Sequence, residues 1–156
     1  MNKAEFIQRI IASLENDLAV AKTVLAATHE AATHAESRAE NKYDTRGLEA
    51  AYLADGQRRR LHEIEQALMS YKNFKVQACD SIRLGALIEV CSDDASRWLY
   101  LGPDAAGLKV DFVGQKILVI SPQSPLGALL IGKEEGDEVV LKTDGRALTY
   151  EVLSVH

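Results

Sequence analysis

The chain has 156 residues and a formal net charge of −5, a length that suits one domain or two small ones. The acidic excess lies entirely in residues 77–156, which carry 12 acidic and 7 basic side chains, whereas residues 1–76 carry 11 of each. Proteins that recognise free duplex DNA usually have a basic surface, so this balance argues against direct DNA recognition.

Targeting and redox signals point to the cytoplasm. The chain has no apolar run of about 18 residues, and we find no signal peptide, so we expect no membrane partner. Cys79 and Cys91 are the only cysteines and form no CxxC motif, which favours a reduced compartment. His29 and His34 are five residues apart and would point to different faces of a helix, so no metal signature is predicted.

Two long helices are predicted in the first half, over residues 2–35 and 48–74. Neither contains proline, and the only glycines up to residue 70 are Gly47 and Gly56. Two helices of similar length with a single connection must turn back on each other to bury their apolar stripes. We therefore predict an antiparallel coiled-coil hairpin whose tip is formed by residues 36–49.

The first helix carries a heptad seam that becomes smaller along its length. Its members are Ile7, Ile11, Leu14, Leu18, Ala21, Leu25, Thr28, Ala32 and Ala35. The second helix shows a clear seam at Leu61, Ile64, Leu68 and Tyr71, with a weaker pattern upstream. Small seam residues bury less apolar surface, so we predict a slender hairpin that is less stable towards its tip.

Charged residues define the two candidate contact regions of the hairpin. The tip cannot bury a core, so its Glu36, Glu40, Asp44 and Glu49 are candidates for contact or chemistry. Arg58, Arg59 and Arg60 form a basic run on the second helix. That run is either a solvated helix face or a contact for a nucleic-acid backbone that a partner presents.

The second half changes to a β-rich pattern. We predict five short antiparallel strands, over residues 84–90, 97–101, 116–120, 137–142 and 148–155. A short helix over residues 125–131 would be capped by Ser124 and ended by Gly132. The predicted fold class is therefore α+β, with a helical hairpin over residues 1–75 and a small β-rich domain over residues 76–156.

The segment from Ser124 to Asp137, SPLGALLIGKEEGD, closely resembles the C-terminal signature of the GreA/GreB transcription elongation factors. Glu138-Val-Val-Leu141 continues that likeness, and Glu40-Asn41 is similar to the acidic tip of the same family. The resemblance implies an antiparallel coiled-coil finger followed by a C-terminal domain of FKBP-like topology.

The resemblance also implies a function. Gre-like factors bind core bacterial RNA polymerase at its secondary channel through the C-terminal domain and direct the tip towards the active-site Mg²⁺. The polymerase then hydrolyses the 3′ end of backtracked nascent RNA. On this basis the chain is no enzyme in its own right and has no cofactor of its own, and Glu40 would share the polymerase's Mg²⁺.

The tip matches the family pattern at some positions and departs from it at another. In the family pattern Asp-x-x-Glu-Asn, Glu40 and Asn41 hold the last two places, whereas Ser37 stands where the aspartate is expected. Serine is a poor ligand for Mg²⁺, and Glu36 is the nearest carboxylate that could replace the aspartate. Two functions therefore stay open: stimulation of cleavage, and occupation of the channel without efficient cleavage.

Docking and nucleic-acid contacts complete the predicted site. Ser124, Pro125 and Leu126 are the predicted polymerase-binding residues, and the apolar row that follows should lie partly inside the core and partly outside. Arg58, Arg59 and Arg60 are the predicted contacts to RNA. We expect the free protein to be a monomer.

Two further interpretations compete with the Gre-like one. An FKBP-like binding module with a coiled-coil oligomerisation stalk would need an aromatic-lined pocket, yet Trp98 is the only tryptophan and Phe112 the only later phenylalanine. A plain coiled-coil dimer through residues 1–74 would leave the acidic tip without a role.

Overall fold

A computed structural model describes residues 1–37 and 46–156, and the side chains of residues 1–31, 48, 49 and 51–156. The chain divides into two compact units, a helical unit of residues 12–69 and a β-rich unit of residues 1–11 with 70–156. This division cuts through both helices, whereas the boundary taken from the sequence follows the change of secondary structure after residue 75. A helical hairpin followed by a β-rich domain, as expected, is confirmed.

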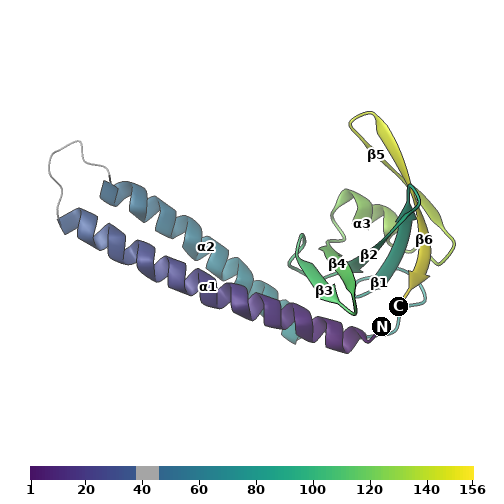
Figure 1. Cartoon of the computed structure of the whole chain (residues 1–156), viewed down its shortest axis with the longest axis horizontal. Coiled ribbons are helices and arrows are strands. Elements are labelled where there is room, and N and C mark those ends of the chain that lie inside the picture. The colour runs from purple at the N-terminus through teal and green to yellow at the C-terminus, as the bar shows by residue number, and fades with distance from the viewer. Residues whose placement is uncertain (38–45) are drawn as a thin grey trace. The chain divides into compact units, whose positions relative to one another are not determined.

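The two long helices are α1, Lys3–Ser37, and α2, Arg46–Lys72. Asn2 begins α1, because its Oδ1 atom accepts a hydrogen bond from the backbone N–H of Glu5 over 3.3 Å. Within the helical unit the two helices run side by side, as Figure 1 shows. The predicted hairpin arrangement agrees with this packing.

Burial along α1 confirms the predicted seam as far as Thr28, and the last two seam positions, Ala32 and Ala35, lie outside the residues whose side chains are described. Leu14 is buried, and the next seam positions, Leu18, Ala21, Leu25 and Thr28, are half-buried while their neighbours are mostly exposed. On α2, Ile64 and Leu68 are buried. Large side chains thus fill the seam near residues 14 and 64–68, and burial decreases along α1 away from them.

The upstream half of α2 differs from its irregular sequence pattern. Ala54 is only 2% exposed, whereas the larger Tyr52 and Leu53 are 67% and 58% exposed. The seam therefore continues through a small residue, and the large apolar side chains beside it face outward. Periodicity of large residues alone could not reveal this, because the seam there contains none of them.

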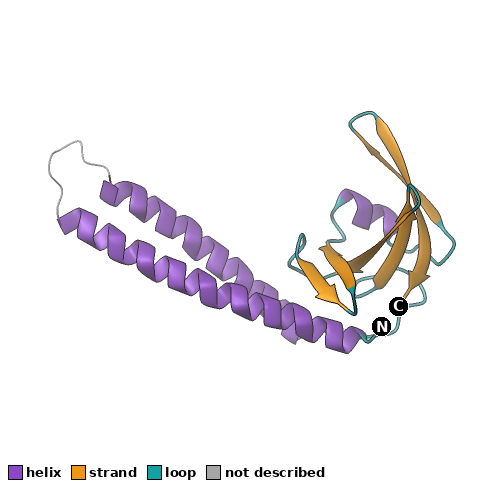
Figure 2. Ribbon diagram, in the orientation of Figure 1, coloured by secondary structure: helices purple, strands orange, loops and turns teal. Residues whose placement is uncertain are grey.

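The β-rich unit contains a six-stranded sheet in the order β3-β4-β2-β1-β6-β5. Figure 2 shows the strands in orange. The strands are β1 Leu87–Ser92, β2 Ala95–Leu101, β3 Lys109–Phe112, β4 Gln115–Ile120, β5 Glu138–Thr143 and β6 Arg146–Val155. The helix α3, Pro125–Leu130, follows β4 and ends before Gly132, whose φ of 80° confirms the predicted stop.

The prediction of five antiparallel strands is wrong in two respects. It missed β3, and it missed that β2 and β4 pair in parallel, with Trp98 opposite Ile117. The two errors share a cause, because β3 reverses the chain between β2 and β4 and so gives β4 the direction of β2. The β3–β4 turn uses Val113 at φ 50° followed by Gly114, and valine gives no signal for such a turn.

The sheet buries side chains on both faces. One face packs a cluster that includes Ile88, Leu99 and Val152 against Leu130 of α3. Tyr100 alternates with Leu99 and so belongs to the other face, where its ring lies 5.1 Å from that of Phe6 at the base of α1. The first turns of α1 therefore form part of the β-rich core.

Candidate functional site

The predicted tip site lies mostly outside the described residues. Glu40 and Asn41 fall in residues 38–45, and of Glu36 only the backbone is described, in the last turn of α1. The side chain of Arg46, at the start of α2, is likewise outside the described part of the chain. The assignment of the tip residues therefore stays a prediction.

The three arginines of α2 do not form one undivided basic patch. Arg58 Nη1 lies 2.7 Å from Asp55 Oδ1, and Arg60 Nη1 lies 3.6 Å from Glu63 Oε2. Consecutive residues are also about 100° apart around a helix, so the three side chains leave the axis in different directions. Two of the three positive charges therefore face an acidic neighbour on their own helix.

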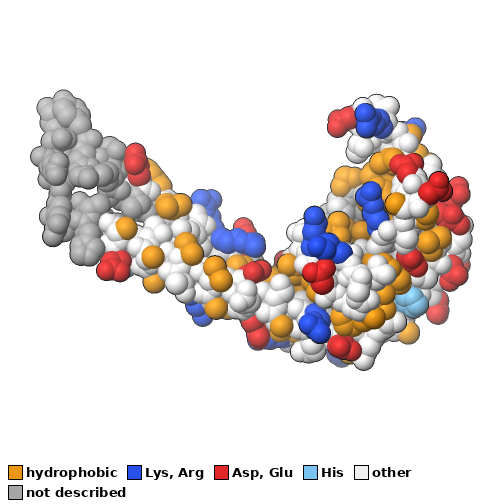
Figure 3. Space-filling view, in the orientation of Figure 1, with side chains coloured by type: hydrophobic (Ala, Val, Ile, Leu, Met, Phe, Trp, Pro, Cys, Tyr) orange, Lys and Arg blue, Asp and Glu red, His pale blue; other side chains and the backbone are white. Residues whose placement is uncertain are grey.

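Arg58 also borders a shallow groove of about 390 Å³ between α1 and α2. Its lining residues are Lys22, Leu25, Ala26, His29, Arg58 and Leu61. The floor is apolar, and two of the bordering side chains are cationic. Figure 3 shows apolar, basic and acidic side chains scattered over the surface of the helices.

The predicted docking residues are brought together at the start of α3. The Oγ atom of Ser124 accepts a hydrogen bond from the backbone N–H of Gly127 over 3.1 Å and donates one to the carbonyl oxygen of Ser121 over 2.7 Å. Pro125 is exposed in the first turn, and Leu126 is half-buried against the core. Ser124 is therefore a structural cap, while Pro125 and part of Leu126 are accessible.

The apolar row of α3 is divided as predicted. Leu130 is fully buried, whereas Leu129 is 38% exposed and Ile131 is 47% exposed. A six-residue helix with one buried anchor presents its remaining apolar side chains to solvent. The accessible side chains at this end of the β-rich unit are therefore Pro125, Leu129 and Ile131, with part of Leu126.

Gly127 is a structural requirement of this loop that the sequence analysis missed. A Cβ atom at this position would lie 2.0 Å from the carbonyl oxygen of Ser121 and 2.8 Å from Ser124 Oγ. The same cap that holds α3 in place therefore demands glycine. The available signal was the glycine itself, since glycine inside a short helix is unfavourable without a packing reason.

A second feature that sequence reasoning missed is the contact between the helix bases and the sheet. The Tyr71 hydroxyl donates a hydrogen bond to the carbonyl oxygen of Asp104 over 2.8 Å, and the Tyr71 and Tyr100 rings lie 6.5 Å apart. Burial raises the pKa of both phenols above the ordinary value of 10.0. Lys3, also buried, donates to the backbone oxygens of Gly85 and His156.

This aromatic contact bears on the FKBP-like alternative. Phe112 lies 5.5 Å from Phe6 and is buried, and Tyr100 is covered by Phe6 and Tyr71. These rings are used in packing and do not line a cavity. The arrangement therefore gives no support to an aromatic-lined peptide pocket at this position.

Neither a cluster of metal-ligating side chains nor a membrane-spanning helix occurs among the described residues. Within residues 1–37 and 46–156, no three His, Cys, Asp or Glu side chains lie close enough to hold a metal ion. In the same part of the chain, no helix has the length and apolar character that crossing a bilayer requires.

The structure combines a two-helix hairpin with a β-rich unit that carries a capped α3 helix. Residues 77–156 match the family described as "Transcription elongation factor, GreA/GreB, C-term". The chain is 30% identical over 138 residues to transcription elongation factor GreA of Halorhodospira halophila, covering 85% of this chain and 80% of that protein. The chain therefore belongs to the GreA/GreB family of transcription elongation factors.

Other relatives match less of their length or are more distant. The GreA of Nitratidesulfovibrio vulgaris is 34% identical over 101 residues, which cover 62% of this chain and 59% of that protein. Among solved structures, Gfh1 of Thermus thermophilus is 19% identical, with 94% of each chain covered and a TM-score of 0.39. A GreA/GreB factor of Nitrosomonas europaea is 21% identical, with 59% and 78% covered and a TM-score of 0.34.

Proposed function

We propose that this elongation factor binds core bacterial RNA polymerase at the secondary channel and directs residues 36–49 towards the active-site Mg²⁺. Membership of the GreA/GreB family is the observation that carries the proposal. The hairpin supports it, because its connection at residues 38–45 carries Glu40 while the seam of α1 becomes less buried along the helix. Small seam residues make that end slender enough for a narrow channel.

The tip residues take the following roles in this proposal. Carboxylate oxygens suit Mg²⁺, so Glu40 shares the polymerase's ion, and the Asn41 amide orients a water molecule beside it. The ion supplies an activated water for hydrolysis of the nascent RNA 3′ end. The factor lends side chains to the polymerase and is not an enzyme by itself.

Ser37 determines how much cleavage this factor stimulates. It is the last residue of α1 and stands where the family pattern has an aspartate. Glu36 is the nearest carboxylate that could replace that aspartate. Occupation of the channel requires only the hairpin, whereas stimulation of cleavage also requires Glu40 and a second carboxylate.

Docking is assigned to the α3 end of the β-rich unit. Exposed apolar side chains on one short helix, with a proline in its first turn, form a small rigid contact surface. We expect Leu129→Glu to weaken binding to core polymerase at least tenfold. The matched control is Val140→Glu, which changes a similarly exposed apolar residue on β5. Equal binding by both variants would contradict the docking assignment.

Cleavage of RNA in a backtracked complex tests the tip. We expect Glu40→Ala to abolish any stimulation, Glu36→Ala to reduce it, and Ser37→Asp to increase it. Glu65→Ala, on an exposed part of α2, is the control carboxylate. If none of these variants changes cleavage but the protein still competes with a second channel-binding factor, the role is occupation. A protein that neither stimulates cleavage nor competes with that factor would overturn the proposal.

The arginine run is assigned to the RNA within the complex. Arg58 and Arg60 face acidic neighbours, and Arg59 is the remaining exposed member of the run. Arg59→Glu should therefore weaken binding to an RNA-containing stalled complex more than binding to RNA-free polymerase. Lys75→Glu, an exposed lysine beyond α2, is the control. An equal loss of binding affinity for both complexes would contradict a contact between Arg59 and the RNA.

In this function the protein acts in the cytoplasm, where the polymerase is, and the free protein is a monomer. Sedimentation equilibrium at micromolar concentration tests whether the free protein is monomeric. A stable dimer would favour the coiled-coil dimer interpretation.

A further inference from the structure

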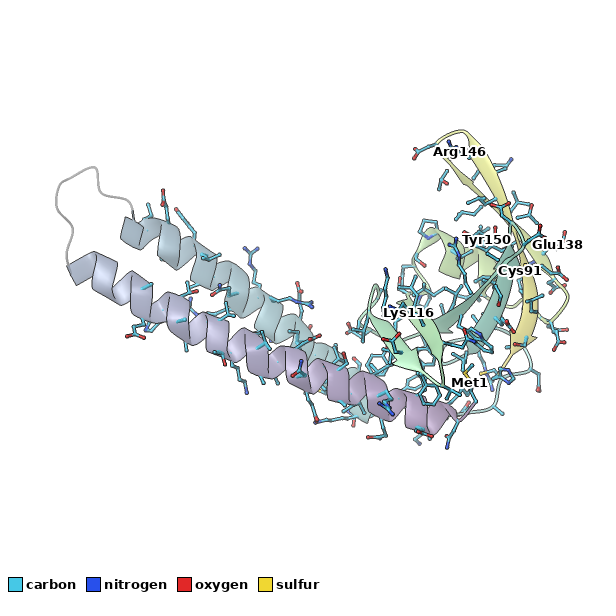
Figure 4. The ribbon with its side chains drawn as sticks, in the orientation of Figure 1. Met1, Cys91, Lys116, Glu138, Arg146 and Tyr150 are labelled. Carbon is cyan, nitrogen blue, oxygen red and sulfur yellow. The ribbon has the colours of Figure 1, made fainter. Side chains whose placement is uncertain are left out.

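Strand β5 lies at an edge of the sheet, and among the described residues no further strand pairs with its outer side. It runs from Glu138 to Thr143, and Figure 4 shows Glu138 and Arg146 towards opposite ends of the β5–β6 hairpin. An edge strand presents unpaired backbone N–H and C=O groups to which another strand can bind. This edge is distinct from the α3 surface and the tip, so an inference from it does not rest on binding to the polymerase.

Every second residue of β5 directs its backbone towards the open edge. The Val152 N–H donates a hydrogen bond to the carbonyl oxygen of Asp137 over 2.8 Å, directly before β5 begins. In an antiparallel ladder, residues that bond to the neighbouring strand alternate with residues that do not. Glu138, Val140 and Lys142 therefore turn their N–H and C=O groups away from β6 and towards the open edge.

The side chains of the same three residues are exposed on one face of the sheet. Val140 is 46% exposed, whereas its neighbour Val139 points to the other face and is buried in the core cluster. Glu138 lies opposite Glu151 of β6, and like charges in such a pair repel each other. Lys142 lies opposite an alanine. Strand β6 therefore offers neither charge a neighbour of opposite sign.

We propose that β5 is a self-association surface whose partner is β5 of a second copy of this chain, paired antiparallel about Val140. In this register Glu138 of each copy lies opposite Lys142 of the other, and Val140 lies opposite Val140 of the second copy. The outward-facing residues of both copies then meet as hydrogen-bonded pairs. The backbone pattern and the charge pattern therefore require the same two-fold, self-complementary register.

The charges also disfavour other arrangements. A parallel in-register pair would place Glu138 opposite Glu138 and Lys142 opposite Lys142, and an antiparallel pair shifted by two residues would place Glu138 opposite Val140. The other edge strand, β3, has only four residues, and its Asp111 already faces Lys116 of β4 over 3.7 Å. Self-pairing is therefore assigned to β5 and not to β3.

The proposed interface is small, so the association is weak. Two six-residue strands bury much less surface than the about 1,600 Å² of a standard protein–protein interface. Exposed ion pairs also contribute little each. We expect a dissociation constant on the order of 0.1 to 1 mM, which keeps the protein monomeric at micromolar concentration.

Sedimentation equilibrium of the full chain at concentrations up to about 1 mM measures this association. Lys142→Glu and Glu138→Lys should each weaken it about tenfold or more, because each substitution places like charges opposite each other at both ends of the interface. An equimolar mixture of the two variants should associate again, because every opposing pair then has opposite charges. Lys109→Glu is the control, since it changes the net charge as Lys142→Glu does but lies exposed on β3.

Amide hydrogen exchange at the same high concentration locates the interface. Exchange at Glu138, Val140 and Lys142 should slow as the concentration of the unmodified chain increases. Val140→Glu should abolish the association and leave polymerase binding at micromolar concentration unchanged, because Val140 lies outside the α3 surface.

Three results would each overturn the proposal. The first is an unmodified chain that stays monomeric up to about 1 mM. The second is an association that both single charge variants retain, which would assign it to another surface such as the helices. The third is a mixture of the two variants that associates no better than either variant alone.

Discussion

At the scale of single residues, Gly127 shows how one hydrogen-bonded cap fixes the identity of a neighbour. Ser121, Ser124 and Gly127 form a closed set, in which the serine hydroxyl bonds to backbone on both sides. The added Cβ would meet a backbone oxygen at 2.0 Å, which no rotamer change relieves. The cost of a side chain here is a shift of the chain itself.

We therefore expect Gly127→Ala to lower the free energy of unfolding by about 3 kcal/mol or more. Gly132→Ala is the matched control, because its Cβ would enter open space and only the positive φ is unfavourable, at a cost of about 1 kcal/mol. Urea denaturation of both variants measures the difference. Equal losses would mean that the loop adapts to a side chain.

The two buried phenols predict a loss of stability in alkali. Burial is the main cause that raises the pKa of Tyr71, and negative charge on Tyr100 and Asp104 raises it further. Burial also raises the pKa of Tyr100, with a smaller contribution from Cys79. The unfolded phenols ionise near pH 10, so the folded state binds more protons above that pH.

Because the folded pKa values are raised, these phenols contribute their full stability below about pH 10 and lose it as the pH increases further. Each tyrosine should contribute a slope of up to about 1.4 kcal/mol per pH unit. Tyr71→Phe should cost about 1 kcal/mol at neutral pH, through the lost hydrogen bond, and make the alkaline slope shallower. Urea titrations between pH 8 and 11.5 measure this, and identical slopes would contradict it.

At the scale of secondary-structure elements, the seam of α1 has a gradient of burial. Leu14 is buried with larger partners near the base, whereas Leu25 is half-buried beside an open groove. We expect Leu14→Ala to cost about 3 kcal/mol and Leu25→Ala about 1 kcal/mol. Thermal unfolding of the two variants compares their stability directly. A larger loss of stability for Leu25→Ala would contradict the predicted gradient.

The elements differ in how well the sequence predicts them, for physical reasons. A heptad seam of large residues repeats over many turns, so α1 and the lower half of α2 were predicted almost to the residue. Ser124 and Pro125 predicted α3, because caps act locally. Strand β3 has only four residues, and its turn into β4 begins with a valine at positive φ, so neither the strand nor the turn gives a recognisable signal although the pairing is local.

The same distinction applies to the candidate site. The α3 surface is a local motif and its division into buried and exposed residues was predicted. The ion pairs of Arg58 and Arg60 with Asp55 and Glu63 depend on helix geometry, and the role of the arginine run remains a prediction. The contacts of Lys3 and Tyr71 join residues far apart in the chain, and a single sequence gives no signal for them. The roles of Glu36, Glu40 and Asn41 remain predictions.

At the scale of the whole molecule, the compact unit that contains the sheet includes both helix bases. Phe6 and Tyr71 cover Tyr100, which is fully buried. A fragment that joins residues 1–11 to 70–156 through a short Gly/Ser linker should therefore fold cooperatively. A fragment of residues 76–156 lacks both covering rings and should unfold at a lower temperature and bind more of a hydrophobic dye. Equal melting temperatures of the two fragments would show that the sheet is stable without residues 1–11 and 70–75.

The position of β1 in the sheet has a consequence for how the protein is made. Its neighbours are β2, which follows at once, and β6, which is the last strand. A ribosome that adds about 5–20 residues per second leaves roughly 7 to 30 seconds between synthesis of Phe6 and completion of β6 at Val155. During that interval the nascent chain exposes an amphipathic helix and half a sheet, which is the kind of surface that chaperones at the exit tunnel bind.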